Sequence, residues 1–134
     1  MVLKPSMVVP GQTSGQRASA REIAEATVTV LMRWVPAAVA GIAFLSGGQS
    51  DLEATVNLNE INVVAAERRA PWPLTFSYGR ALQHAALTTW MGNDANVAAA
   101  QAALAHRAHM NGLAALGRYT PDSEKERELA GATA

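Results

Sequence analysis

Apolar and polar positions along this chain alternate between strand-like runs and helical stripes. The first nine residues are rich in Val, Leu and Met and end at a Pro-Gly pair, which predicts a short buried strand near residues 2–8. A second run, Gly41–Leu45, is apolar throughout and is followed by a glycine turn, as expected for a strand buried in a parallel sheet. The run Pro71–Phe76 predicts a third strand, near residues 73–77.

Helices are predicted between these strands. Ser19–Glu22 and Ser50–Glu53 both have the form S-x-x-E, in which the serine caps a backbone amide at the start of a helix and the glutamate returns the bond. The first helix must end before Pro36, and the second leads to Ile61, with a loop expected over residues 62–70. The apolar stripe of the first helix comprises Ile23, Ala26, Thr27, Val30, Leu31 and Trp34.

The last part of the chain predicts two more helices. An apolar helix is expected over Ala81–Met91 and a long alanine-rich helix over Asp94–Leu116, followed by a glycine of the kind that commonly ends a helix. The order of the elements predicts an α/β fold with three parallel strands, right-handed crossovers and a long C-terminal helix. We expect one domain over residues 1–119 and a polar, mobile C-terminal tail over residues 120–134.

Composition narrows the class of protein. The 134 residues include 11 basic and 11 acidic side chains, so the chain has no net charge and lacks the basic character that nucleic-acid binding requires. The longest apolar stretch, Val35–Leu45, falls far short of the ~20 residues that span a bilayer, and the N-terminus has no signal-peptide pattern. The absence of cysteine excludes disulfides and thiolate chemistry. We therefore expect a soluble, cytoplasmic protein with no nucleic-acid or membrane partner.

Two glycine turns follow predicted strands, at the strand ends where parallel α/β sheets bind their ligands. Ser46-Gly47-Gly48 follows the second strand and Ser77-Tyr78-Gly79-Arg80 follows the third. Free backbone amides at a helix start suit a phosphate group, and glycine lets an anion approach them closely. Arg80 adds a guanidinium that matches phosphate oxygens. The alternative is that serine and glycine serve only the geometry of the two turns.

Lys4 is the other chemical candidate. A desolvated lysine with a lowered pKa attacks carbonyl groups, whereas a lysine near the start of a chain is usually an exposed cation. The histidines His84, His106 and His109 form no set of metal ligands by their spacing, so we expect them at helix surfaces, and we expect no metal and no cofactor. The tryptophans lie beside apolar positions and are expected in the core: Trp34, Trp72 and Trp90.

Five segments together resemble the class I fructose-bisphosphate aldolases. These segments are Leu3–Val8, Phe44–Ser50, Asn57–Asn62, Leu74–Gln83 and Gly112–Tyr119. The resemblance implies the C-terminal part of a (β/α)8 TIM barrel, its last three βα units, since a complete barrel needs about 250 residues. The acidic residues and the further lysine that serve catalysis in this family lie on earlier strands, which this chain does not contain.

The resemblance also implies roles for the candidate residues. Lys4 would form the Schiff base with the ketose, Ser46, Gly47 and Gly48 would form one phosphate turn, and Ser77, Gly79 and Arg80 would form the other. The implied glycolytic reaction is the reversible cleavage of fructose 1,6-bisphosphate to glyceraldehyde 3-phosphate and dihydroxyacetone phosphate. The alternative is a non-catalytic, truncated half-barrel that retains only a phosphate-binding turn. An open sheet leaves strand edges exposed, so we expect a homo-oligomer or association through the exposed barrel edges.

Overall fold

A computed structural model describes residues 1–125 of the chain. Three strands form one parallel sheet: β1 (Val2–Leu3), β2 (Gly41–Phe44) and β3 (Leu74–Phe76). The strands lie in the order β1-β2-β3, and the register places Phe44 beside Phe76. The predicted α/β arrangement of three parallel strands is confirmed.

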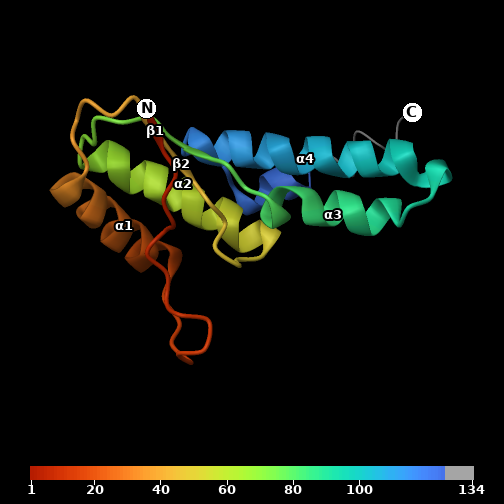
Figure 1. Cartoon of the computed structure of the whole chain (residues 1–134), viewed down its shortest axis with the longest axis horizontal. Helices are drawn as coiled ribbons and strands as arrows, with labels where there is room; N and C mark the ends of the chain where they lie inside the picture. Colours follow the sequence, from red (N-terminus) through yellow and green to blue (C-terminus); the bar gives the residue numbers. More distant parts are fainter. Residues whose placement is uncertain (126–134) are drawn as a thin grey trace.

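The helices follow the strands as the sequence pattern predicts. The α-helices are α1 (Ala20–Trp34), α2 (Asp51–Glu67), α3 (Arg80–Trp90) and α4 (Val97–Ala115), and short 3-10 helices are η1 (Asp94–Asn96) and η2 (Pro121–Glu124). In Figure 1, α1 and α2 lie side by side at one end of the molecule. The helices α3 and α4 form a hairpin that reaches the opposite end.

The helices α1 and α2 each begin with a serine cap, as predicted. The Glu22 amide donates to Ser19 Oγ at 3.3 Å, and the Ser19 amide donates to the Glu22 carboxylate at 2.8 Å. Ser50 and Glu53 repeat the pair with distances of 3.3 and 2.9 Å. The hydrogen bonds from the serine backbone amides are the main reason why the pKa of each glutamate lies below its ordinary value.

The core lies between the sheet and the inner faces of the helices. Ile42 and Phe44 of β2 are fully buried, and so are Leu58 and Ile61 of α2. Because β2 is the central strand, Ile42 and Phe44 are covered by the helices and by the neighbouring strands, whereas Ala43 is half-buried.

Two predicted boundaries are wrong, each for a clear physical reason. The segment expected to be a loop continues α2 to Glu67, because Val64 and Ala65 extend the buried face of that helix. The strand expected near residues 2–8 is only two residues long, because Pro5 has no N–H to continue the ladder. The Pro5 carbonyl still accepts a hydrogen bond from the Leu45 amide at 3.0 Å.

The prediction that all three tryptophans are core residues is also wrong. Trp72 is buried and donates its indole N–H to the Pro36 carbonyl at 3.0 Å. Trp34 is 80% exposed and Trp90 is 41% exposed. Trp34 is the last residue of α1, so no described element covers this end of the predicted stripe. Val30, which belongs to the same stripe, is also exposed.

The chain turns back after α4. Gly117 takes a left-handed conformation with φ of 65°, and the Arg118 amide donates to the Leu113 carbonyl at 2.9 Å, as expected of a glycine that ends a helix. Residues 120–125, the first part of the expected tail, include η2, and Glu124 of this segment bonds to α4. The rest of the expected tail, residues 126–134, lies outside the described residues.

Across residues 1–125, no helix combines the length and the apolar character needed to cross a lipid bilayer.

Candidate functional site

Backbone hydrogen bonds bring the carboxyl ends of the three strands to one edge of the sheet. The Leu45 amide bonds to the Pro5 carbonyl at 3.0 Å, next to Lys4, and the Ser77 amide bonds to the Phe44 carbonyl at 2.8 Å. The segments that carry Lys4, Ser46 and Ser77 therefore follow adjacent strands at the same edge. The Lys4 side chain is exposed there.

The turn after β2 requires both of its glycines. Gly47 and Gly48 have φ of 57° and 82°, in the left-handed region that favours glycine. Ser46 is buried, and its carbonyl accepts bonds from the Gln49 amide at 3.1 Å and from Gln49 Nε2 at 2.8 Å. A Cβ atom on Gly48 would collide with the side-chain amide of Gln12. The loop after β1 is therefore packed directly against this turn.

The two turns offer their backbone amides differently. The start of α2 is closed by the Ser50 cap, so the turn after β2 would hold an anion with the amides of the turn itself. The helix α3 begins after Gly79, where the described residues supply no side-chain cap. The amides of Arg80 and Ala81 therefore lie outside the helix's own hydrogen bonds, at the positive end of its dipole.

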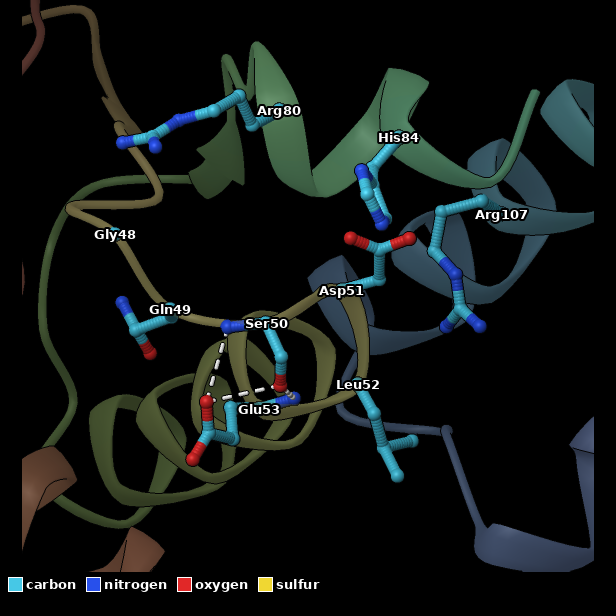
Figure 2. A pocket seen from close by; sticks show the side chains of 9 residues that line it. All are labelled: Gly48, Gln49, Ser50, Asp51, Leu52, Glu53, Arg80, His84 and Arg107. Carbon is cyan, nitrogen blue, oxygen red and sulfur yellow. Dashed lines mark hydrogen bonds between the residues drawn. The ribbon is translucent and has the colours of Figure 1, made fainter. Parts of the chain in front are cut away.

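A cavity of about 620 Å³ lies between the starts of α2 and α3 and one side of α4. Residues 48–53 line it together with Arg80, His84 and Arg107. In Figure 2, Arg80 extends toward the loop that carries Gly48, while His84 and Arg107 lie at the other end, around Asp51. The structure thus brings one residue from each predicted phosphate turn to the same cavity.

The other predicted residues are not part of the lining of this cavity. Lys4, Ser46, Ser77 and Gly79 do not line it. Gly47 and Gly48 border a second cavity of about 530 Å³, which residues of the loop over positions 9–18 also line. The sheet edge thus carries two adjoining hollows that share Gly48.

Tyr78, within the second turn, has a structural role. Its hydroxyl donates to the Ala54 carbonyl of α2 at 2.9 Å, and its ring centre lies 5.4 Å from that of Phe76. Burial raises the pKa of Tyr78 well above its ordinary value, so the phenol stays protonated. Through this bond Tyr78 fixes the turn that carries Arg80 to the first turns of α2.

A polar network that the sequence analysis missed positions Arg107 at the cavity. Arg107 Nη1 and Nη2 donate to the two Glu124 carboxylate oxygens at 2.8 and 3.2 Å. His106 Nε2 lies 2.8 Å from Glu124 Oε2, and the Tyr119 hydroxyl donates to Oε1 at 3.1 Å. Burial is the largest single influence and opposes ionisation, but the hydrogen bonds from Arg107 and His106 together keep the pKa of Glu124 below its ordinary value. Burial and the Glu124 charge raise the pKa of Tyr119 to about 12.

The same network reaches the start of α2. Arg107 Nη1 donates to Thr55 Oγ1 at 3.3 Å, and the Thr55 hydroxyl lies 2.7 Å from Asn111 Oδ1 and 2.9 Å from the Asp51 carbonyl. Thr55 and Asn111 are fully buried. His106 is therefore not the simple surface residue that was predicted. No sequence motif marks these residues, because the contacts that join α4 to Glu124 and to α2 link positions 17 to 56 apart along the chain.

Within residues 1–125, no three His, Asp or Glu side chains gather in a way that could hold a metal ion.

Comparisons with known proteins place the chain in a family. The family model for class I fructose-bisphosphate aldolase matches residues 1–132. Fructose-bisphosphate aldolase 2 of Caenorhabditis elegans is 60% identical over 118 residues, which cover 88% of this chain and 32% of that protein. Fructose-bisphosphate aldolase C of Gallus gallus is 56% identical over 118 residues, covering 88% of this chain and 85% of that sequence.

A solved structure agrees with these sequence comparisons. The fructose-bisphosphate aldolase of Plasmodium falciparum, in a ternary complex with TRAP and a small-molecule inhibitor, superposes with a TM-score of 0.84 at 48% sequence identity. The superposition covers 89% of this chain and 33% of that chain. The chain spans about a third of the length of the two Caenorhabditis elegans aldolases that it matches. From the match over residues 1–132 and these identities, the chain belongs to the class I fructose-bisphosphate aldolase family.

Proposed function

We propose that this chain carries the Schiff-base lysine and the phosphate turns of a fructose-bisphosphate aldolase. The reaction is the reversible cleavage of fructose 1,6-bisphosphate to glyceraldehyde 3-phosphate and dihydroxyacetone phosphate, in cytoplasmic glycolysis. One observation carries the proposal: the Lys4 strand and the two glycine turns meet at one sheet edge, in a chain 60% identical to a named aldolase.

The three βα units fit the last third of a (β/α)8 barrel. The superposition covers 33% of the Plasmodium falciparum chain, and a complete barrel needs about 250 residues. We place the barrel domain over residues 1–119, with Glu124 tying the beginning of the following segment to α4.

In this proposal Lys4 is the nucleophile. Its Nζ adds to the ketose carbonyl, and loss of water then gives the Schiff base. The amine must first be deprotonated, whereas an unperturbed lysine has a pKa of about 10.4. Lys4 is exposed to solvent in this chain. We therefore expect slow Schiff-base formation here, and faster formation where further strands surround the lysine.

The two turns hold phosphate groups through different donors. Gly47 and Gly48 offer backbone amides in a turn of left-handed backbone that packs against Gln12. Arg80 offers a guanidinium beside the uncapped start of α3. Both sets of donors border the hollows at the edge of the sheet that carries Lys4.

Borohydride trapping tests the role of Lys4. The chain is incubated with dihydroxyacetone phosphate and sodium borohydride, and the reduced adduct is located by peptide mass spectrometry. We expect the adduct on Lys4 rather than on Lys125, the second lysine, whose side chain is 75% exposed. Equal labelling of the two lysines would show that Lys4 is an ordinary surface amine.

Substitution of Arg80 tests the phosphate turns. Arg80→Ala should weaken binding of fructose 1,6-bisphosphate by roughly 1.5–3 kcal/mol, the range for hydrogen bonds to charged groups, and Arg80→Lys should restore part of it. Isothermal titration calorimetry measures the difference, with Arg118→Ala as a matched control because Arg118 lies outside the cavity. Equal affinities for the wild type and Arg80→Ala would show that the two turns serve only the geometry of the chain.

A non-catalytic half-barrel is the second candidate, and the exposure of Lys4 favours it. Such a chain would keep phosphate binding at Arg80 and associate through the free edges of β1 and β3, which pair only with β2 in the described sheet. A coupled dehydrogenase assay separates the two candidates. Turnover on the order of 1 s⁻¹ or above by the pure chain would exclude the non-catalytic candidate.

A further inference from the structure

One asparagine of the chain stands directly before a glycine, inside a helix. Of the asparagines in the sequence, Asn111 alone has glycine as its next residue. In an Asn-Gly pair the glycine has no side chain to hinder its own backbone nitrogen, which can attack the carbonyl carbon of the asparagine side chain. Asn111 and Gly112 both lie within α4. The fold therefore decides whether this attack takes place.

The helix keeps the two reacting groups apart. The Gly112 amide belongs to the helical ladder of α4, in which the N–H of residue 112 donates to the carbonyl of residue 108. Closing a ring between the Gly112 nitrogen and the Asn111 side chain requires a backbone ψ outside the helical range. The attack must therefore wait until this turn of α4 opens.

Side-chain contacts hold the same turn closed. Asn111 is fully buried, and its Oδ1 lies 2.7 Å from the Thr55 hydroxyl of α2. Asn111 Nδ2 has no hydrogen-bond partner among residues 1–125, so the contact with Thr55 is the bond that holds this side chain. Arg107, one turn earlier on α4, donates to the same hydroxyl and to Glu124. Opening the turn at Asn111 therefore breaks the Thr55 bond and loosens the Glu124 network.

We propose that Asn111 is a site of spontaneous deamidation, which the packing of α4 and the Glu124 network suppress in the folded chain. When the turn opens, the Gly112 nitrogen forms a bond to Asn111 Cγ. The bond between Cγ and Nδ2 breaks, and ammonia leaves together with the amide proton, which gives a five-membered succinimide. Water then opens either carbonyl group of the succinimide and gives aspartate or isoaspartate at position 111.

Neither product suits the place that Asn111 occupies. Isoaspartate continues the main chain through the side-chain carbon, so an additional methylene enters the backbone and interrupts the hydrogen-bond ladder of α4. Aspartate places a negative charge at a fully buried position, which is unfavourable unless the charge is paired. A chain that has opened at this turn and reacted therefore keeps a lasting covalent change next to the start of α2.

Peptide mass spectrometry of aged protein tests the site. The full chain is kept in mildly alkaline buffer or in concentrated urea, and the conversion of each asparagine is followed over time. Isoaspartate is identified with protein L-isoaspartate methyltransferase. In urea we expect Asn111 to convert faster than every other asparagine. In buffer its rate should be at least ~10-fold lower, because only the open fraction reacts.

Asn93 serves as the control within the same chain. It is exposed and has an extended backbone before η1, so no helical turn protects it. Its rate should differ by less than ~3-fold between buffer and urea. Equal rates for Asn111 in buffer and in urea would overturn the proposal, and so would a faster asparagine elsewhere in the unfolded chain.

Variants separate the chemistry from the protection. In urea, Gly112→Ala should slow the conversion of Asn111 at least ~5-fold, because its methyl group hinders the attacking nitrogen. In buffer, Thr55→Val and Glu124→Gln should each raise the Asn111 rate at least ~3-fold, because the turn opens more often. Thr55→Ser and Asp122→Ala are the matched controls and should stay within ~2-fold of the wild type. Wild-type rates in both Thr55→Val and Glu124→Gln would overturn the protective role of the network.

Discussion

Glu124→Gln should lower the free energy of unfolding, by an amount that can be worked out from how far the Glu124 network is buried. The side chains of Glu124, Arg107 and His106 are 23, 12 and 18% exposed. Exposed ion pairs contribute about 0–1 kcal/mol, whereas breaking a buried pair costs about 3–5 kcal/mol. The partly buried Arg107 would lose its counter-charge but keep a neutral acceptor, so we expect a loss of about 1–3 kcal/mol at pH 7.

The effect should depend on pH with a defined sign. The pKa of Glu124 in the folded chain lies below its ordinary value, which is about 4.3 for a glutamate in an unfolded chain. The stability that its ionisation contributes is therefore present above about pH 4.3 and is lost as the pH falls through the folded pKa. The difference between wild type and Glu124→Gln should be largest near neutrality and should shrink in acid.

Urea unfolding followed by far-UV circular dichroism, at pH 7 and at about pH 3, measures both quantities. Asp122→Asn is the matched control, because Asp122 lies in the same segment, is 86% exposed and, among residues 1–125, forms an ion pair with Lys125 alone. Its replacement should change the free energy of unfolding by less than about 1 kcal/mol. The reasoning fails if Glu124→Gln behaves like Asp122→Asn at pH 7, or if its effect is the same at both pH values.

Five further substitutions, at four positions, test local features of the fold by the same urea assay. Ser50→Ala should lower the free energy of unfolding by about 1 kcal/mol, because α2 loses its cap. An unchanged free energy of unfolding would show that the cap does not stabilise the chain. Thr55→Val should cost about 1–3 kcal/mol because it leaves the buried Asn111 side chain without its hydroxyl partner, and Thr55→Ser should recover most of this. Gly48→Ala should cost about 1–2 kcal/mol for its positive φ, whereas Gly112→Ala, in a helix with open space at the Cβ position, should stabilise the chain by up to about 1 kcal/mol. Similar effects at both glycines would contradict the backbone argument.

The features that the sequence predicted correctly depend on residues close together in the chain. The Ser19 and Ser50 caps act over three residues, and Gly117 ends α4 through bonds to residues three to five positions earlier. The parallel order of the strands follows from the alternation of elements and the handedness of crossovers. The meeting of Gly48 and Arg80 at one cavity follows in turn, because the carboxyl ends of parallel strands share one edge.

The features that were missed depend on contacts between distant segments. The extension of α2 through Val64 is decided by burial against the rest of the core, which overrides a pattern that looked like a loop. Gln12 packs against Gly48, and Glu124 bonds to Arg107. No local pattern in the sequence predicts either contact. The sequence does not predict the exposure of Trp34 either, because the apolar stripe of α1 continues past the described elements that cover its other residues.

The order of the strands has a consequence for the time at which each part of the chain can fold during synthesis. β2 pairs with β1 and β3 pairs with β2, so the order of the strands in the sheet is also their order of translation. The unit β1-α1-β2 can therefore form while β3 is still within the ribosome. Glu124 is made after all four helices, and its bonds to Arg107 connect, through Thr55, to the start of α2. A nascent chain released before Glu124 would hold its sheet but lack this final connection, and it should be digested by protease near the end of α4 more readily than the longer chain.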